Sequence, residues 1–207
     1  MKPATPPRRR PEGRSGPPPA AAARVVLLNK PYGVLCQFSP DVSGKPTLAQ
    51  FVPIPGVYPA GRLDADSEGL VVLTADGALQ ARIANRRHRY AKVYRVQVEG
   101  MPTRAQMDRL AAGIDLGDFV TAPVAARVIA EPPGLWPRDP PIRVRRAIPT
   151  SWLELTLHEG KNRQIRRMTA AVGLPTLRLI RWAIGPWTIE GLPPGVARSE
   201  AAPTRVV

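Results

Sequence analysis

The feature that most constrains the fold of this chain is a run of four apolar residues, 70–73, that follows a short charged loop and ends at an Asp-Gly turn over 76–77. A run of leucine and valine bounded by glycines predicts a buried β-strand. The loop before the strand therefore lies at the edge of a core, on a rigid base. It carries Asp64 between Arg62 and Asp66, so it holds a carboxylate and its charge partners in fixed geometry, as a functional site requires.

Two stretches alternate between apolar and other residues, which is the period of a half-buried strand. They cover residues 92–98, with Tyr94 on the inward face, and residues 151–157. Together with the helices below, the strands predict an α+β fold. Shorter apolar segments predict further strands over 25–29, 34–38, 120–130 and 177–180.

Helices are predicted where a capping residue precedes an amphipathic stretch. Thr47 and Thr103 each begin a capping-box pattern, and Asp76 can cap a third helix. A further helix begins near residue 162, and its apolar face carries Ile165 at helical spacing from later apolar residues. The opposite face, turned to solvent or to a cleft, carries three arginines, Arg163, Arg166 and Arg167.

Three segments are expected to lie outside the regular elements. Residues 1–23 are rich in proline, arginine and alanine and should stay disordered, and residues 200–207 form a C-terminal tail. The domain between them, 24–199, contains a basic insert over 131–149 with six prolines, too many for a helix or a strand. The insert is either a mobile loop over a substrate or an ordinary surface insertion.

The charge of the chain points to its class of partner. Its 207 residues include 30 Lys and Arg against 16 Asp and Glu, a formal charge of +14. Such an excess favours a polyanion, of which nucleic acid is the commonest, although a genome that favours arginine and proline would give the same composition. No apolar run approaches the roughly 20 residues of a membrane span, so no membrane partner is expected. One cysteine, Cys36, excludes an internal disulfide, two histidines argue against a zinc site, and the cytoplasm is the expected compartment.

Four motifs, in order, resemble those of the pseudouridine synthases of the RsuA family. They are residues 29–34 (Asn-Lys-Pro-Tyr-Gly-Val), 61–77 (beginning Gly-Arg-Leu-Asp), 92–96 (Lys-Val-Tyr-Arg-Val) and 159–168 (Glu-Gly-Lys-Asn-Arg-Gln-Ile-Arg-Arg-Met). The resemblance covers nearly all of 24–190, and Ser67 stands where the family usually has threonine, which keeps the hydroxyl. In the insert, residues 136–138 (Trp-Pro-Arg) and 149–152 (Pro-Thr-Ser-Trp) resemble a branch that acts on the large ribosomal subunit.

The resemblance implies a pseudouridine synthase fold: a mixed, mostly antiparallel sheet in two lobes, with helices flanking a central cleft. It implies site-specific isomerisation of uridine to pseudouridine in ribosomal RNA, here 23S RNA, without a metal or other cofactor. A monomer is expected, although the sequence carries no pattern that sets the oligomeric state. This redox-neutral reaction suits a chain without a phosphate-binding glycine loop, a dinucleotide motif or a metal-ligand cluster. Many relatives carry an S4-type RNA-binding domain before the catalytic domain. None is expected in this chain, so RNA binding falls to the catalytic domain.

The site residues follow from the matched motifs. Asp64 is the catalytic carboxylate, and whether it attacks the sugar, attacks the base or removes a ribose proton stays open. Arg166 is expected to pair with Asp64, and Tyr94 to stack on the uracil and assist proton removal at C5. Lys30 and Tyr32 line the cleft unless they only form a turn. The other expected substrate contacts are Ile165 against the base, Arg62 in the space left by a flipped nucleotide, and Lys161, Arg163, Arg167 and Arg181 at phosphates.

Other interpretations of these residues remain open. Tyr94 could be an ordinary core residue, and Arg62 and Asp64 a surface turn beside a solvated arginine face. A noncatalytic rRNA-binding or ribosome-assembly factor would share the charge and the arginine helix but would not need Asp64. A metal-dependent nuclease using Asp64, Asp66 and Glu68 is a third class, which the adjacent arginine disfavours because it competes with a metal.

Overall fold

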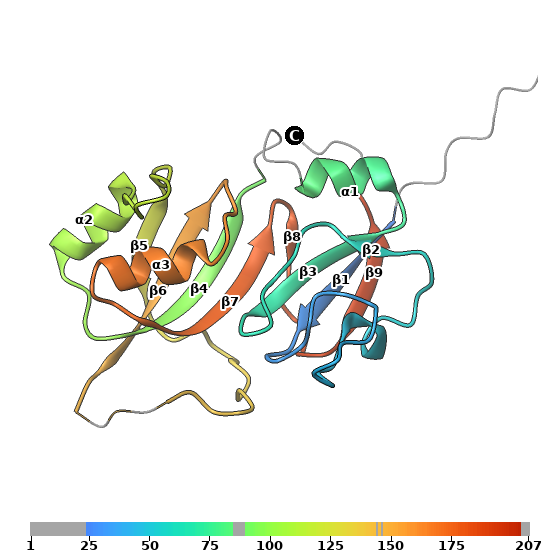
Figure 1. The fold of residues 1–207 in the computed structure, drawn as a ribbon, viewed down its shortest axis with the longest axis horizontal. Coiled ribbons are helices and arrows are strands. Elements are labelled where there is room, and N and C mark those ends of the chain that lie inside the picture. The colour runs from blue at the N-terminus through green and yellow to red at the C-terminus, as the bar shows by residue number, and fades with distance from the viewer. Residues whose placement is uncertain (1–23, 85–89, 144, 146, 204–207) are drawn as a thin grey trace, which may run out of the picture.

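The computed structural model describes residues 24–84, 90–143, 145 and 147–203 (Figure 1). Within them the strands form one sheet in the order β5-β6-β4-β7-β3-β1-β9, with β2 added at β3 and β8 at β7. The strands are β1 (Arg24–Lys30), β2 (Tyr58–Pro59), β3 (Glu68–Thr74), β4 (Lys92–Glu99), β5 (Ala125–Ile129), β6 (Thr150–Leu157), β7 (Thr176–Ile184), β8 (Trp187–Thr188) and β9 (Ala197–Ala201). The helices are the short 3₁₀ helix η1 (Leu48–Gln50), α1 (Gly77–Ala84), α2 (Arg104–Ala112) and α3 (Gln164–Ala171).

The sheet divides into two lobes that meet at β3 and β7. The other strand pairings of the described residues are antiparallel, whereas β3 and β7 are parallel and share two register pairs, Glu68 with Ile180 and Gly69 with Arg181. Figure 1 shows α1 beside the half that holds β1, β3 and β9, the first lobe. Helices α2 and α3 lie beside the half that holds β4, β5 and β6, the second lobe. This mixed, mostly antiparallel sheet in two lobes confirms the predicted fold class.

The joint between the lobes depends on one glycine. Gly69 has a φ of 103°, and a Cβ atom at this position would lie 2.3 Å from the carbonyl oxygen of Arg181. Glycine alone combines this positive φ with so close an approach of two backbones. The joint also begins where the loop that carries Asp64 ends, so the same few residues set both the lobe contact and the position of that loop.

The elements with the clearest sequence patterns form as predicted. Strands β4 and β6 pair along their whole length. Asp76 caps α1, its Oδ1 accepting hydrogen bonds from the amides of the first turn at 2.9 and 3.0 Å. Thr103 and Gln106 form the predicted capping box of α2. The inward residues of β4 and β6 pack with α2 and α3 in one core cluster, which includes Tyr94, Val96, Val98, Leu153, Leu155 and Leu157.

Three expectations about local structure are wrong. Residues 34–38 form no strand, because amides there bond within a compact loop; the amide of Leu35, for example, donates to the carbonyl of Pro46 at 2.8 Å. The side chain of Thr47 makes no capping hydrogen bond to η1, a single 3₁₀ turn. The strand expected over 120–130 is confined to β5, because the amides of Thr121 and Val124 bond back toward α2.

Strand β9 lies at the edge of the sheet, where a strand needs no alternation of apolar residues. Its sequence therefore carries no pattern that predicts a strand. Its residues are partly or fully exposed, and backbone pairing with β1 holds it in place. The expected boundary between 199 and 200 falls inside this strand. The described part of the insert, by contrast, forms no helix or strand, as predicted. The N-terminal segment 1–23 and the basic cluster 86–89 lie outside the described residues.

Candidate active site

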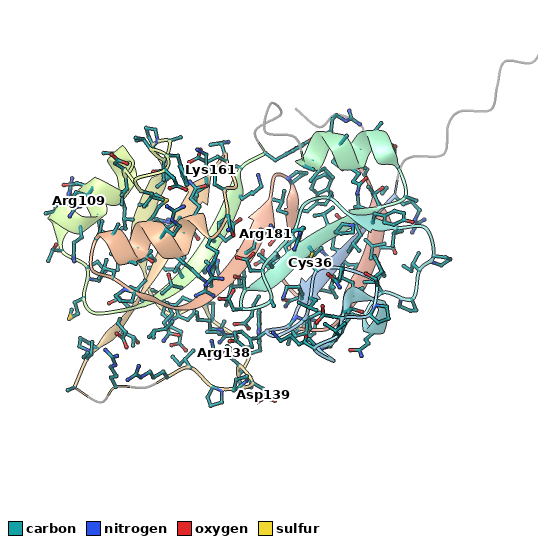
Figure 2. All side chains as sticks on the ribbon, viewed as in Figure 1. Cys36, Arg109, Arg138, Asp139, Lys161 and Arg181 are labelled. Carbon is teal, nitrogen blue, oxygen red and sulfur yellow. The ribbon has the colours of Figure 1, made fainter. Side chains whose placement is uncertain are left out.

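A cavity of about 550 Å³ lies where the two lobes meet. Its walls come from the loop 60–67 before β3, the end of α1, the start of β4, the segment 157–165 that leads into α3, and Leu179 and Arg181 of β7. Figure 2 labels Arg181 near the middle of the molecule and Lys161 above it, beside α3. Both lobes therefore contribute to one cavity, and segments far apart in the sequence meet there.

The loop before β3 is a rigid turn that presents Asp64. The amide of Ser67 donates to the carbonyl of Asp64 at 3.1 Å, which closes the turn. The amide of Gly33 donates to the carbonyl of Ala65 at 2.8 Å, which ties the loop to the turn after β1. The Asp64 side chain lines the cavity and is 43% exposed. A carboxylate on a fixed backbone thus stays accessible to a substrate.

Asp66, rather than Asp64, is the main partner of the arginines of α3. Its Oδ2 lies 2.8 Å from Nη2 of Arg163 and 3.4 Å from Nε of Arg166, whereas Asp64 lies 3.8 Å from Arg163. Partial burial works against ionisation of Asp66, but these two guanidiniums hold its pKa below the usual value. The expected Arg166–Asp64 ion pair is therefore wrong as a direct contact. Arg166, three residues after Arg163, contacts the carboxylate of Asp66 instead, and its Nη2 donates to the backbone carbonyl of Asp66 at 2.5 Å.

One part of the cavity wall is apolar and aromatic. Tyr94 and Ile165 both line it, although each also packs in the core cluster of the second lobe. Tyr94 is thus a core residue and a cavity wall at once, so the two interpretations of its sequence pattern do not exclude each other. A ring and an aliphatic side chain facing one cavity suit a flat, partly apolar ligand.

The buried Arg181 and the half-buried Lys92 form a cationic part of the cavity wall. Arg181 is 4% exposed; its Nε donates to the carbonyl of Leu70 at 2.7 Å and its Nη1 to the carbonyl of Arg62 at 3.2 Å. Its Nη2 is buried without a hydrogen-bond partner among the described residues. Burial and the charge of Arg181 lower the pKa of Lys92. Lys92 was missed by sequence reasoning, although it opens the motif that contains Tyr94.

Two expected substrate contacts lie elsewhere. Lys30 is fully buried, lies outside the cavity wall and donates to the carbonyls of Pro31 and Val34 at 2.9 and 2.8 Å. Burial lowers the pKa of Lys30 to about 8. Arg167 bonds to Asp118 at 3.1 Å and to the carbonyl of Leu116 at 2.9 Å, also outside the cavity wall. Both cations thus already bond to groups of the protein itself. The assignment to substrate is therefore wrong for Lys30 and unsupported for Arg167. Arg62, Lys161, Arg163 and Arg181 do line the cavity, as does Ile165.

The three acids of the nuclease interpretation do not converge. Glu68 is 2% exposed and accepts two hydrogen bonds from Arg178, at 2.8 and 2.7 Å. Asp66 is engaged by two arginines, which leaves Asp64 as the accessible carboxylate of the set. In the part of the chain that the structure describes, no three His, Cys, Asp or Glu side chains assemble as metal ligands. The arrangement does not fit a metal-dependent nuclease that uses these acids.

A basic cavity whose wall holds an accessible carboxylate, a tyrosine ring and aliphatic side chains suits an enzyme that acts on a base of a polyanionic chain. A family model described as RNA pseudouridylate synthase matches residues 24–171. The chain therefore belongs to the RNA pseudouridylate synthase family, as its four motifs predict.

Curated relatives are similar over most of their length. A protein of Xanthomonas axonopodis pv. citri (strain 306), named ribosomal large subunit pseudouridine synthase E, is 58% identical over 86% of this chain and 94% of its own. A protein of the same name from Vibrio vulnificus (strain CMCP6) is 50% identical over 87% of this chain and 76% of its own. Ribosomal large subunit pseudouridine synthase B of Bacillus subtilis (strain 168) is 34% identical over 83% of this chain and 66% of its own.

Solved structures agree with the family. One, titled crystal structure of pseudouridylate synthase, superposes with a TM-score of 0.71 at 30% identity, over 86% of this chain and 70% of its own. An archaeal box H/ACA Nop10-Cbf5 complex gives a TM-score of 0.53 at 15% identity, over 80% of this chain and 49% of its own, which shows the fold alone. Among the described residues, no helix has the length and apolar character to cross a bilayer.

Proposed function

We propose that the chain isomerises specific uridines to pseudouridine in ribosomal RNA, with 23S RNA of the large subunit as substrate and Asp64 as the catalytic carboxylate. The single observation that carries the role of Asp64 is its place: it lies on the family motif, on a rigid turn, in the wall of a basic cavity that both lobes build. The large-subunit substrate is supported by the names of the relatives that match most of this chain.

The reaction breaks the N1–C1′ bond of uridine, turns the base and joins C5 to C1′, with loss of the C5 proton. A uridine within folded RNA must first leave its stack, at a cost of a few kcal/mol. Arg62, exposed at the cavity edge, is suited to fill the space it leaves. The flipped base then fits over Tyr94 and Ile165, with the ribose toward Asp64.

The cations of the cavity divide the remaining work. Arg163 lies 3.8 Å from the carboxylate of Asp64 and can help to orient it, while Asp66 keeps Arg163 and Arg166 in place. Nη2 of Arg181, which has no hydrogen-bond partner among the described residues, can donate to an oxygen of the uridine or of its phosphate. Lys161 is placed at the cavity wall to meet the RNA backbone. The carboxylate of Asp64 can attack the sugar, attack the base or remove a ribose proton, and each route needs this same placement.

The test is Asp64→Asn, which keeps size and removes the charge. Wild-type protein should introduce carbodiimide-resistant adducts at discrete uridines of 23S RNA, and Asp64→Asn should introduce none while its RNA affinity stays within about tenfold. Asp108→Asn is the matched control, because it removes a carboxylate from an exposed pair on α2, and it should behave as wild type. Full activity of Asp64→Asn would refute the catalytic assignment. RNA binding by the wild type without any product would identify a noncatalytic rRNA-binding factor.

The compartment and the oligomeric state belong to the same proposal. Ribosomal RNA as substrate supports a cytoplasmic location. A monomer is the oligomeric state that we propose.

A further inference from the structure

The insert crosses from one lobe to the other, and its described residues take no part in the cavity wall. It leaves the sheet after β5 and returns at β6, both in the second lobe. Leu135 and Trp136, in the first part of the insert, nevertheless pack against the core cluster that includes Leu70 of β3. Of the described residues that line the cavity, none belongs to 131–149. The insert therefore differs from a loop that covers a substrate.

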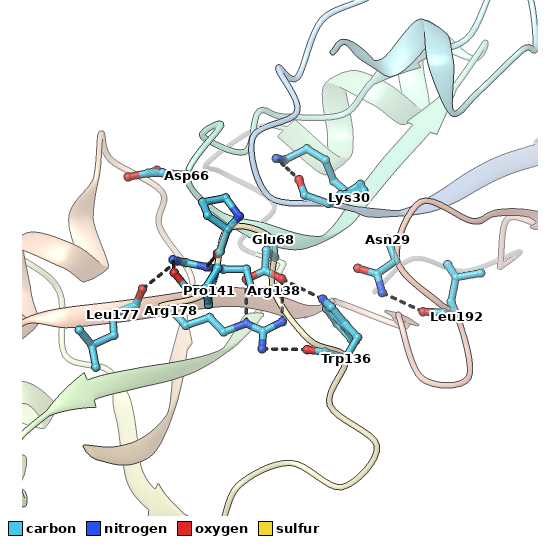
Figure 3. Close-up of polar contacts among 12 residues, drawn as sticks. Asn29, Lys30, Asp66, Glu68, Trp136, Arg138, Pro141, Leu177, Arg178 and Leu192 are labelled. Carbon is cyan, nitrogen blue, oxygen red and sulfur yellow. Dashed lines mark hydrogen bonds and ion pairs between the residues drawn. The ribbon is translucent and has the colours of Figure 1, made fainter. Parts of the chain in front are cut away.

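The first contact of the insert is with the residue that ends the Asp64 loop. Nε1 of Trp136 donates to Oε2 of Glu68 at 2.8 Å, and Arg178 donates to both oxygens of Glu68 (Figure 3). Arg178 also donates to the backbone carbonyl of Trp136 at 3.0 Å. Because Glu68 is buried and directly follows Ser67, this closed set of bonds fixes the C-terminal end of the loop.

The second contact reaches the side of the same loop. The guanidinium of Arg138 lies 4.4 Å from the ring centroid of Tyr32, and its Nη1 donates to the carbonyl of Leu177 at 3.2 Å. Arg138 thereby joins the turn after β1 to the start of β7. The residue after Tyr32 is Gly33, whose amide holds the carbonyl of Ala65. Arg138 thus supports the backbone directly after Asp64.

We infer that Trp136 and Arg138 are positioning residues for Asp64. The ion pair of Asp64 with Arg163 is long, 3.8 Å, so the backbone of the loop does most of the work of placing the carboxylate. The insert supports that backbone at two points, one on each side of Ser67, and bridges lobes whose own joint is two residue pairs long. This inference rests on the proposed function, because it gives the insert a role in the reaction of Asp64.

The test compares single substitutions in the insert. Trp136→Phe removes the hydrogen bond to Glu68 but keeps an aromatic ring, and Arg138→Ala removes the contact with Tyr32. Each should lower kcat about 10- to 100-fold, the effect of a misplacement of about 1 Å, with KM and RNA affinity within about twofold. Arg138→Lys, which keeps a cation over Tyr32, should recover part of the loss. Arg143→Ala is the matched control, because it removes an exposed arginine of the same insert, and it should leave kcat unchanged.

A second measurement does not depend on the reaction. Amide hydrogen exchange of the peptide covering residues 60–68 should be at least about tenfold faster in Trp136→Phe and in Arg138→Ala than in wild type or Arg143→Ala. Unchanged exchange and unchanged kcat would overturn the inference. A rise in KM alone, or an equal effect of Arg143→Ala, would also overturn it and would make the insert an RNA contact. If the wild type forms no pseudouridine while exchange still rises in the two variants, the proposed function fails and the support of the loop stands.

Discussion

The buried pair of Glu68 and Arg178 gives the sharpest test of how the two lobes are joined. Glu68→Gln keeps the size of the side chain but replaces one carboxylate oxygen with an amide NH₂ group. That group is itself a donor and faces the donors of Arg178 and Trp136. The two charged side chains are 2% and 6% exposed, so water cannot replace the lost interaction. Removing one partner of such a pair costs about 3–5 kcal/mol. At about 2–4 °C per kcal/mol for a chain of this size, Tm should fall by about 6–20 °C.

The assay is urea unfolding followed by circular dichroism, with thermal melts in parallel. Asp108→Asn is the matched control, because it breaks an ion pair in which the side chain of Asp108 is 60% exposed and that of Arg104 is 90% exposed. It should lower the free energy of unfolding by at most about 0.5 kcal/mol. The double variant Glu68→Met with Arg178→Met should cost less than the two single changes together, since neither charge is then stranded. A loss below about 1 kcal/mol for Glu68→Gln would refute the reasoning.

Three other predictions concern charge and chemistry. Burial lowers the pKa of folded Lys30 to about 8 from 10.5, so the unfolded chain binds more protons between these pH values. The free energy of unfolding should therefore rise by about 3 kcal/mol from pH 8 to 10.5 relative to Lys30→Met, and parallel pH curves would contradict this. Tyr94→Phe should bind the RNA with wild-type affinity but react at least about tenfold more slowly, in single-turnover kinetics; an unchanged rate would remove the hydroxyl from the mechanism. Lys161→Ala should reduce the salt slope of RNA binding by roughly one, whereas Arg109→Ala, on the exposed face of α2, should leave it at the wild-type value. A wild-type slope in Lys161→Ala would show that Lys161 meets no phosphate.

The fold is predictable from sequence where one local pattern and burial agree. The alternation in β4 and β6 predicts their pairing faces, and Asp76 and Thr103 predict the starts of two helices. The pattern fails where long-range contacts decide. The segment 34–38 is as apolar as a strand, but its amides bond to a nearby loop, and β9 has no pattern because its place depends on pairing with β1.

The sequence predicts which residues line the candidate site, but it does not predict which of their side chains contact one another. The motifs bring Asp64, Tyr94 and Ile165 into one cavity wall, because each motif lies at the end of an element that reaches the joint. Which arginine meets which acid cannot be inferred from spacing. Arg163 occupies a left-handed conformation with a φ of 48° immediately before α3, and this turn carries its side chain to Asp66 and Asp64. No sequence pattern announces that backbone conformation at an arginine.

The two acids of the loop gain distinct tasks from this geometry. Asp66 comes from the first lobe and Arg163 and Arg166 from the second, so their ion pairs close the cleft across the joint. A carboxylate that neutralises both arginines cannot also react freely, and its lowered pKa keeps it anionic at every physiological pH. Because Asp66 makes the close ion pairs with both arginines, Asp64 is left with one long ion pair and an exposed side chain. A second acid two residues from Asp64 thus lets one loop both hold the lobes together and keep an accessible carboxylate in the cavity wall.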